Sequence, residues 1–138
     1  MEKYPHYLER LQNATRKYWD KAALNSIGGE SFTYGQMATQ IEKFHLVFEK
    51  LGIQKREKIA LWARNGARWG MSYLAVNTYE TVIVPLLADF TAENATFLVN
   101  HSESIALFTN EDKFAQIYHI FFRILMSNFV HRFVVDFD

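Results

Sequence analysis

Apolar residues between positions 37 and 51 recur at alternating spacings of four and three residues. This spacing is typical of one apolar face of an α-helix, formed by Met37, Ile41, Phe44, Phe48 and Leu51. Thr33 and Gln36 have the spacing of a capping box, which marks a helix start. Gly52 suits the left-handed position that follows many helix ends. We therefore predict a helix between Thr33 and Gly52.

Three short apolar runs begin at Ile59, Val82 and Ile105, at equal intervals of 23 residues. Two helical stretches separate these runs. The first lies near 67–79, and the second begins after Asp89 and Thr91, which can cap it, and ends near residue 100. Strands and helices that alternate at this pace predict βαβ units and a mostly parallel sheet.

The middle run, TVIVPLL, differs from an ordinary surface strand in two respects. It has no polar alternation, so we expect a strand covered on both faces. Pro85 lies late in the run, and proline cannot donate a ladder hydrogen bond, so the strand should end there or lie at a sheet edge.

The N-terminal part predicts a helix and then a β-hairpin. Apolar and aromatic residues lie near helical spacing at Tyr7, Leu8, Leu11, Tyr18 and Trp19. The short runs AALNSI and ESFTY flank Gly28-Gly29, and glycine tolerates the positive φ that hairpin turns require. The predicted fold class is α/β, a mostly parallel sheet with flanking helices plus an N-terminal β-hairpin.

Residues 114–138 form an apolar tail, which we separate from an α/β unit at 1–113. Phe121, Leu125, Phe129 and Phe133 recur every fourth residue, which permits a helix, while RFVVDF equally permits a strand. Charged and polar residues interrupt the tail too often for a membrane span. We expect the tail to pack on the sheet. The alternative is an amphipathic surface for a membrane or a partner.

Composition narrows the possible functions. Hydrophobic residues make up 49% of the 138 positions, enough for a real core, and the 15 basic residues balance the 15 acidic ones. This balance gives no reason to expect a nucleic-acid partner. The absence of cysteine excludes disulfides and thiolate metal sites. The first residues contain no apolar run of signal-peptide length, so we expect a cytoplasmic protein.

No familiar catalytic or phosphate-binding motif is present. The sequence lacks GxGxxG, a P-loop, a nucleophile elbow and histidine pairs with metal-ligand spacing. His45 lies beside the apolar face of the predicted helix, and helix capping accounts for Asp89. Basic residues gather between Lys50 and Arg68, whereas 69–112 contains six acids and no Lys or Arg. We expect these stretches to form solvated faces; the alternative is that the acidic stretch neutralises the basic one, within the fold or in a larger chain. We assign no catalytic, cofactor-binding or metal residue.

The order of these landmarks resembles the beginning of the adenylate-forming (AMP-binding) acyl-CoA synthetases, most closely the long-chain fatty acid CoA ligases. The resemblance covers about Tyr18 to Lys113 and is carried by the segments WDKAAL, ESFTYGQM, LGIQKREKIALWARNGARW and SYLAVNTYETVIVPLLADFTAENATFLVNHSESIALFTNED. The positions that match the family pattern are Asn65, Trp69, Val84, Pro85, Leu86, Thr91, Glu93 and Leu98. It implies a partial N-terminal subdomain of the adenylate-forming enzyme fold.

The chain departs from the family pattern at several positions. Arg68 replaces the usual acid before Trp69, and Arg56-Glu57 stands where Gly-Asp is common. Glu80 replaces the usual small residue, and Leu87-Ala88 takes the place of a Tyr-Pro pair. The tail after Lys113 matches no part of the pattern.

The resemblance implies that a carboxylate attacks the α-phosphate of ATP, pyrophosphate leaves, and CoA captures the acyl-adenylate. Mg²⁺ and cationic groups stabilise the charge that develops in such a reaction. In the family, these groups come from a Ser/Thr/Gly-rich loop ending in Lys, from later acidic motifs and from a Lys of a C-terminal domain. None of these motifs lies in residues 1–138. A parent enzyme is therefore expected to use ATP, Mg²⁺, CoA and a fatty acid, while this chain alone binds no cofactor and is inactive.

Two expectations concern partners. The remainder of a parent chain is the first partner, and a truncated α/β layer should also self-associate through the apolar surface that it exposes. The alternative to a ligase fragment is a stand-alone α/β module for binding or dimerisation, without catalysis.

Overall fold

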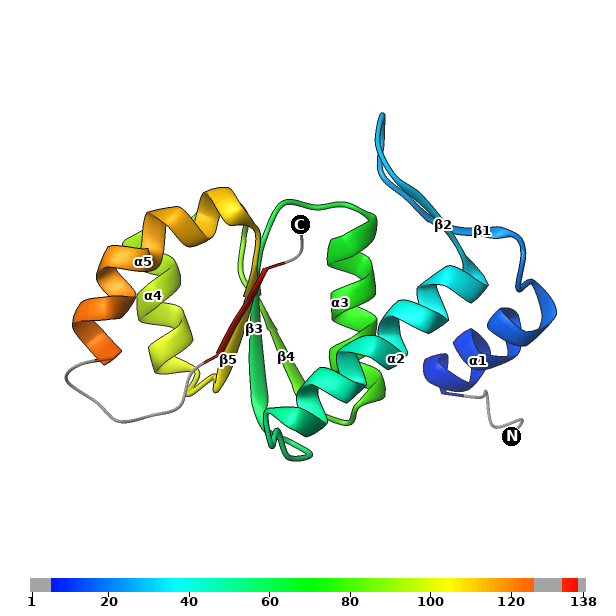
Figure 1. The fold of residues 1–138 in the computed structure, drawn as a ribbon, viewed down its shortest axis with the longest axis horizontal. Coiled ribbons are helices and arrows are strands. Elements are labelled where there is room, and N and C mark those ends of the chain that lie inside the picture. The colour runs from blue at the N-terminus through cyan, green and yellow to red at the C-terminus, as the bar shows by residue number, and fades with distance from the viewer. Residues whose placement is uncertain (1–5, 126–132, 137–138) are drawn as a thin grey trace, which may run out of the picture.

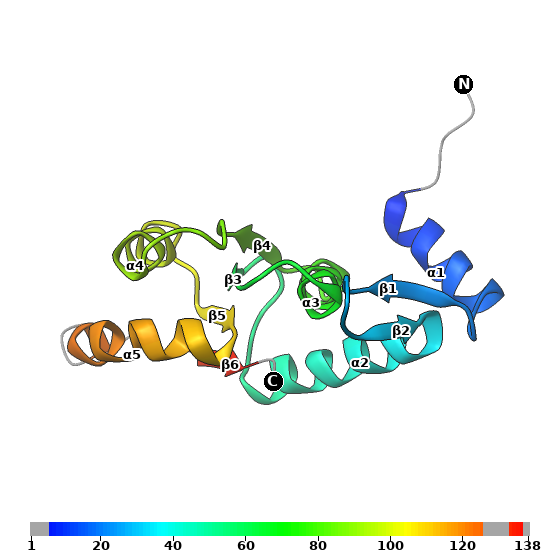
Figure 2. The ribbon, with the colours of Figure 1, turned by 90° about the horizontal axis from the view of Figure 1, so that it is seen from above.

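Two helical layers enclose a short parallel sheet, and an N-terminal helix and hairpin lie beside them (Figure 1; Figure 2). The computed structural model describes residues 6–125 and 133–136. In chain order these residues form α1 (Tyr7–Lys17), β1 (Ala22–Asn25), β2 (Ser31–Thr33), α2 (Tyr34–Lys50), β3 (Lys58–Trp62), α3 (Ala67–Thr78), β4 (Val82–Pro85), α4 (Ala92–His101), β5 (Ala106–Thr109), α5 (Glu111–Leu125) and β6 (Phe133–Asp136). The predicted α/β class, with its parallel sheet and hairpin, is confirmed.

The sheet has the strand order β4-β3-β5-β6, and all of its pairings are parallel. The helices α2 and α3 cover one face, and α4 and α5 cover the other (Figure 2). Alternate residues of β3 therefore enter different cores, since Ile59 and Leu61 pack with Phe48 of α2 while Trp62 packs with Ile117 of α5. This central strand joins the two layers into one unit.

The strand β4 lies at one edge of the sheet and ends at Pro85, as predicted. The expectation that both of its faces are covered holds only in part. Ile83 packs against the core on one face and Val84 against the core on the other, but Val82 is 45% exposed and Pro85 is also exposed. The strand has β3 on one side, and no described element pairs with its other side. By contrast, all four residues of β5 are buried, because that strand has neighbours on both sides.

The helix α2 begins and ends as predicted. The Thr33 hydroxyl accepts a hydrogen bond from the Gln36 N–H, and the Gln36 side chain accepts one from the Thr33 N–H, which completes the capping box. Gly52 follows the helix with a φ of 70°. The apolar face of α2 serves two clusters. Its first turns pack on α3 and the hairpin, and its last turns pack on the sheet.

The two N-terminal elements are also confirmed. The strands β1 and β2 pair antiparallel, and Gly28 in their turn has a φ of 69°, while Gly29 does not require positive φ. The helix α1 has no buried residue and contacts α2 by its Leu11 side.

The apolar tail contains both structures that its pattern permits. Helix α5 occupies its first part, and β6 pairs with β5 near its end, whereas Phe129 lies outside the described residues. The division of the chain at residue 113 stays a prediction. In the described part of the chain, none of the helices has the length and apolar character needed to cross a bilayer.

Candidate functional site

The carboxyl edge of the sheet contains a point where the chain diverges. The strands β3 and β5 are parallel neighbours, but β3 leads into α3 on one face and β5 leads into α5 on the other. In open α/β sheets, ligands bind in the crevice that such a divergence leaves outside the strand ends. This position is therefore the first place to look for a functional site.

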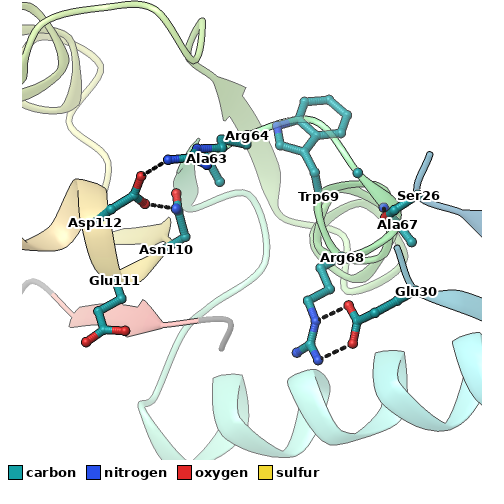
Figure 3. A pocket seen from close by; sticks show the side chains of 11 residues that line it. Ser26, Glu30, Ala63, Arg64, Ala67, Arg68, Trp69, Asn110, Glu111 and Asp112 are labelled. Carbon is teal, nitrogen blue, oxygen red and sulfur yellow. Dashed lines mark hydrogen bonds and ion pairs between the residues drawn. The ribbon is translucent and has the colours of Figure 1, made fainter. Parts of the chain in front are cut away.

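A cavity of about 420 Å³ lies at this point (Figure 3). Its walls come from the hairpin turn, the loop after β3 with the first turn of α3, and the first turn of α5. The lining residues are Ser26, Glu30, Ala63, Arg64, Gly66, Ala67, Arg68, Trp69, Asn110, Glu111 and Asp112. We call this cavity the switch-point crevice.

Ser26 and Trp69 shape the side of the crevice next to α3. The Ser26 hydroxyl accepts a hydrogen bond of 2.9 Å from the Ala67 N–H, so a hairpin side chain caps the first turn of α3. The N-cap residue itself, Gly66, supplies no side chain for this purpose. The half-buried Trp69 ring stacks on Tyr73 with 5.5 Å between the ring centroids. The Ser26 hydrogen bond thereby fixes the end of the hairpin to the first turn of α3.

An ion pair between Arg68 and Glu30 spans the same side (Figure 3). The Arg68 Nε donates to one Glu30 carboxylate oxygen and Nη2 donates to the other, both at 2.6 Å. Hydrogen bonds from Arg68, reinforced by its charge, hold the pKa of the Glu30 carboxyl below its ordinary value. Both side chains are nearly half exposed, so the pair contributes at most about 1 kcal/mol.

We expect the Arg68→Ala substitution to raise the pKa of Glu30 toward its ordinary value. A carboxyl whose pKa is lowered by folding stabilises the protein above the pKa of the unfolded state, and this contribution is lost as the pH falls through the lowered folded value. At neutral pH the variant should therefore have a free energy of unfolding that is lower by up to about 1 kcal/mol. In acid, where Glu30 is protonated, its contribution to this difference should disappear. NMR titration of the Glu30 carboxyl carbon and urea unfolding at both pH values measure this. An unchanged Glu30 titration in the variant contradicts it.

The opposite side of the crevice is held by the α5 turn. The Arg64 guanidinium pairs with the Asp112 carboxylate, and the Asn110 amide donates to the other oxygen of that carboxylate (Figure 3). The Asn110 Oδ1 atom is buried and has no hydrogen-bond partner among the described residues. The ends of β3 and β5 are thus connected across the crevice by polar side chains.

Three ion pairs join the basic stretch to the acidic one. Lys55 pairs with Glu80 at 2.8 Å, Lys58 approaches Glu103 to 4.0 Å, and Arg64 pairs with Asp112. Each of these ion pairs joins a residue before the third helix to one after it. These three basic side chains therefore pair with acids of the same chain.

Two residues singled out in the sequence lie away from the crevice. The expectation that helix capping accounts for Asp89 is wrong, because Asp89 is exposed in a turn and the cap of α4 is Thr91. The Thr91 hydroxyl accepts from the Asn94 N–H at 3.3 Å. The half-buried His45 Nε2 lies 3.0 Å from both the Ala75 carbonyl oxygen and the Thr78 hydroxyl. His45 therefore joins α2 to α3 at the boundary of the core.

Sequence reasoning missed the side chains that hold the crevice together. Glu30 and Asn110 lie in turns, and no motif marks either residue. It also missed Lys113, which is only 7% exposed, donates to the Ala88 carbonyl oxygen and lies 4.4 Å above the Trp62 ring. The alternation of helices and strands predicts a parallel sheet, but neither its strand order nor the loop residues that reach across the strand ends.

A family model of AMP-binding enzymes matches residues 11–125, more than half of the chain. Among characterised relatives, an oxalate–CoA ligase of Arabidopsis thaliana is 28% identical over 74% of this chain and 20% of its own length. A chloroplastic long-chain-fatty-acid–[acyl-carrier-protein] ligase of the same plant is 29% identical over 75% of this chain and 15% of its own length. The chain thus spans a fifth or less of these relatives.

Solved structures show the same fold. A coronafacic acid ligase of Pectobacterium brasiliense superposes with a TM-score of 0.83 at 18% identity, over 97% of this chain and 26% of that one. The N-terminal subdomain of NpsA from Klebsiella oxytoca gives a TM-score of 0.69 at 13% identity, over 93% of this chain and 30% of that one. The predicted fold, part of the N-terminal subdomain of adenylate-forming enzymes, is confirmed. The chain belongs to the family of AMP-binding enzymes.

Proposed function

We propose that this chain is the N-terminal part of an ATP-dependent ligase that joins a fatty acid to CoA through an acyl-adenylate. The family match over residues 11–125 carries this proposal. The two relatives described above are both ligases, and they join an acid to CoA or to acyl-carrier protein. One of them acts on long-chain fatty acids, and the sequence segments quoted above resemble the same class.

The switch-point crevice does not fit a magnesium–nucleotide complex. Arg64 and Arg68, the arginines that line it, each pair with a carboxylate, and Glu111 adds a further negative charge. A triphosphate requires cationic or backbone N–H donors that are available to it. Across residues 6–125 and 133–136, no three metal-ligating side chains lie close enough to hold a metal ion. We therefore derive no adenylation step from these residues.

This misfit supports the second part of the proposal, that residues 1–138 do not catalyse adenylation alone. The longer polypeptide supplies the nucleotide site, and the chain described here supplies a sheet with two helical layers on which that site is built. ATP, Mg²⁺ and CoA are then ligands of the longer polypeptide.

The test is ATP–pyrophosphate exchange, measured on the 138-residue chain and on the product of the whole gene. A long-chain fatty acid and oxalate serve as the two acids, because the relatives differ in this substrate. We expect no exchange above the enzyme-free blank for the short chain, and exchange with the fatty acid for the longer product. Exchange by the short chain contradicts its inactivity, and a longer product that exchanges only with oxalate contradicts the fatty acid.

A further inference from the structure

We propose that the outer edge of β4 is an internal interface, covered by the remaining part of a ligase-length polypeptide. The β4 edge is defined as the side of Val82–Pro85 that faces away from β3, together with Leu87. This inference rests on the proposed function, because it requires the longer polypeptide to exist.

The composition of this segment is that of a buried strand. Residues 81–88, TVIVPLLA, contain no charged side chain. Even so, Val82 is 45% exposed and Leu87 is 67% exposed. Natural proteins protect free sheet edges with charges, proline or a covering element, and an exposed apolar edge otherwise invites association. In this segment Pro85 is the one residue that protects the edge in this way, so we infer that another part of the polypeptide buries the apolar side chains beside it.

Backbone geometry indicates how the cover makes contact. The Val82 and Leu86 N–H groups donate to the Glu57 and Leu61 carbonyl oxygens on the β3 side, at 2.8 and 2.9 Å. The backbone N–H groups of a strand point alternately to its two edges, so the Ile83 N–H and the Pro85 nitrogen lie on the outer edge of β4. Pro85 has no N–H, so a second strand can receive few hydrogen bonds along this edge. The contact is therefore made mainly by side chains, and two copies of the chain cannot pair well here as strands.

The length of the relatives identifies the occupant. The superposition on the coronafacic acid ligase takes in 97% of this chain but only 26% of the ligase. About three-quarters of a ligase-length polypeptide is thus available to cover surfaces that this part of the fold exposes. Parallel sheets of α/β proteins are normally covered on both faces, a condition that Ile83 and Val84 meet but the exposed Val82 does not.

Cysteine labelling tests the interface, because the chain has no cysteine of its own. Leu87→Cys, and Lys43→Cys on the exposed polar side of α2, are made in the 138-residue chain and in the product of the whole gene. Alkylation by iodoacetamide is followed by mass spectrometry of the peptide that carries each introduced cysteine. We expect Cys at position 87 to react at least about tenfold more slowly in the longer product, since a covered thiol reacts only after local opening. The position 43 control should react equally in both.

Three outcomes overturn the inference. Equal reactivity at position 87 in a longer product that shows ATP–pyrophosphate exchange overturns it alone and leaves the proposed function standing. Protection that rises with protein concentration identifies a second copy as the occupant. A reading frame that ends after codon 138 overturns both the inference and the proposed function.

Discussion

Replacement of Phe48 by alanine should lower the free energy of unfolding by about 3–5 kcal/mol, the range for a fully buried phenylalanine. The Phe48 side chain has no exposed surface, and its ring lies 5.6 Å from that of Phe108 in β5 and 5.1 Å from that of Tyr79 at the end of α3. It therefore joins α2, α3 and the sheet at one point. Urea unfolding followed by circular dichroism measures the loss.

The matched control is Leu46→Ala in the same helix. Leu46 is 58% exposed, so its truncation removes little buried surface and should change the free energy of unfolding by less than about 0.5 kcal/mol. Alanine has a high helix propensity in both variants, so propensity does not distinguish them. Losses of equal size would show that Phe48 is not the junction between the helical layer and the sheet.

The sequence was sufficient for the parts of the fold that depend on local pattern. In α2, the capping box predicts the start of the helix, the C-terminal glycine predicts its end, and the apolar face agrees with the span between them. The apolar character of TVIVPLL predicted the strand correctly and the burial of its middle residues in part, but not the exposure of Val82. An apolar sequence shows that a strand is suited to burial. It does not show which elements cover the strand, because those elements lie elsewhere in the fold or in a longer chain.

The crevice was less predictable than the fold. The strand–helix alternation predicts a parallel sheet but not that β3 and β5 are neighbours, and the Arg68–Glu30 pair joins residues 38 positions apart. Its formation depends on how the hairpin docks against α3, which is a tertiary event. The uneven charge distribution gave the one useful indication, because it showed that the basic stretch had acids available within the same chain.

Two of the residues that depart from the ligase pattern have a left-handed backbone conformation. Arg56 and Glu80 are two such departures, and they have φ values of 68° and 63°. Glu80 directly follows the C-cap of α3, where its N–H donates to the Asn77 carbonyl oxygen and the Thr81 N–H donates to the Val76 carbonyl oxygen. This is a Schellman motif, whose left-handed residue is usually glycine. A side chain in this conformation costs about 1–2 kcal/mol.

The Glu80→Gly substitution should therefore increase the free energy of unfolding by about 0.5–1 kcal/mol, because the relief of strain exceeds the extra entropy of glycine in the unfolded chain. Glu80→Ala is the control, since it also removes the exposed ion pair with Lys55 but keeps the Cβ atom. The same two changes at Glu42, an exposed residue within α2, should give the opposite order, with alanine more stable than glycine by about 1 kcal/mol. Thermal and urea unfolding of the four variants measure both differences. If alanine is the more stable residue at position 80 as well, the left-handed backbone is not a source of strain there.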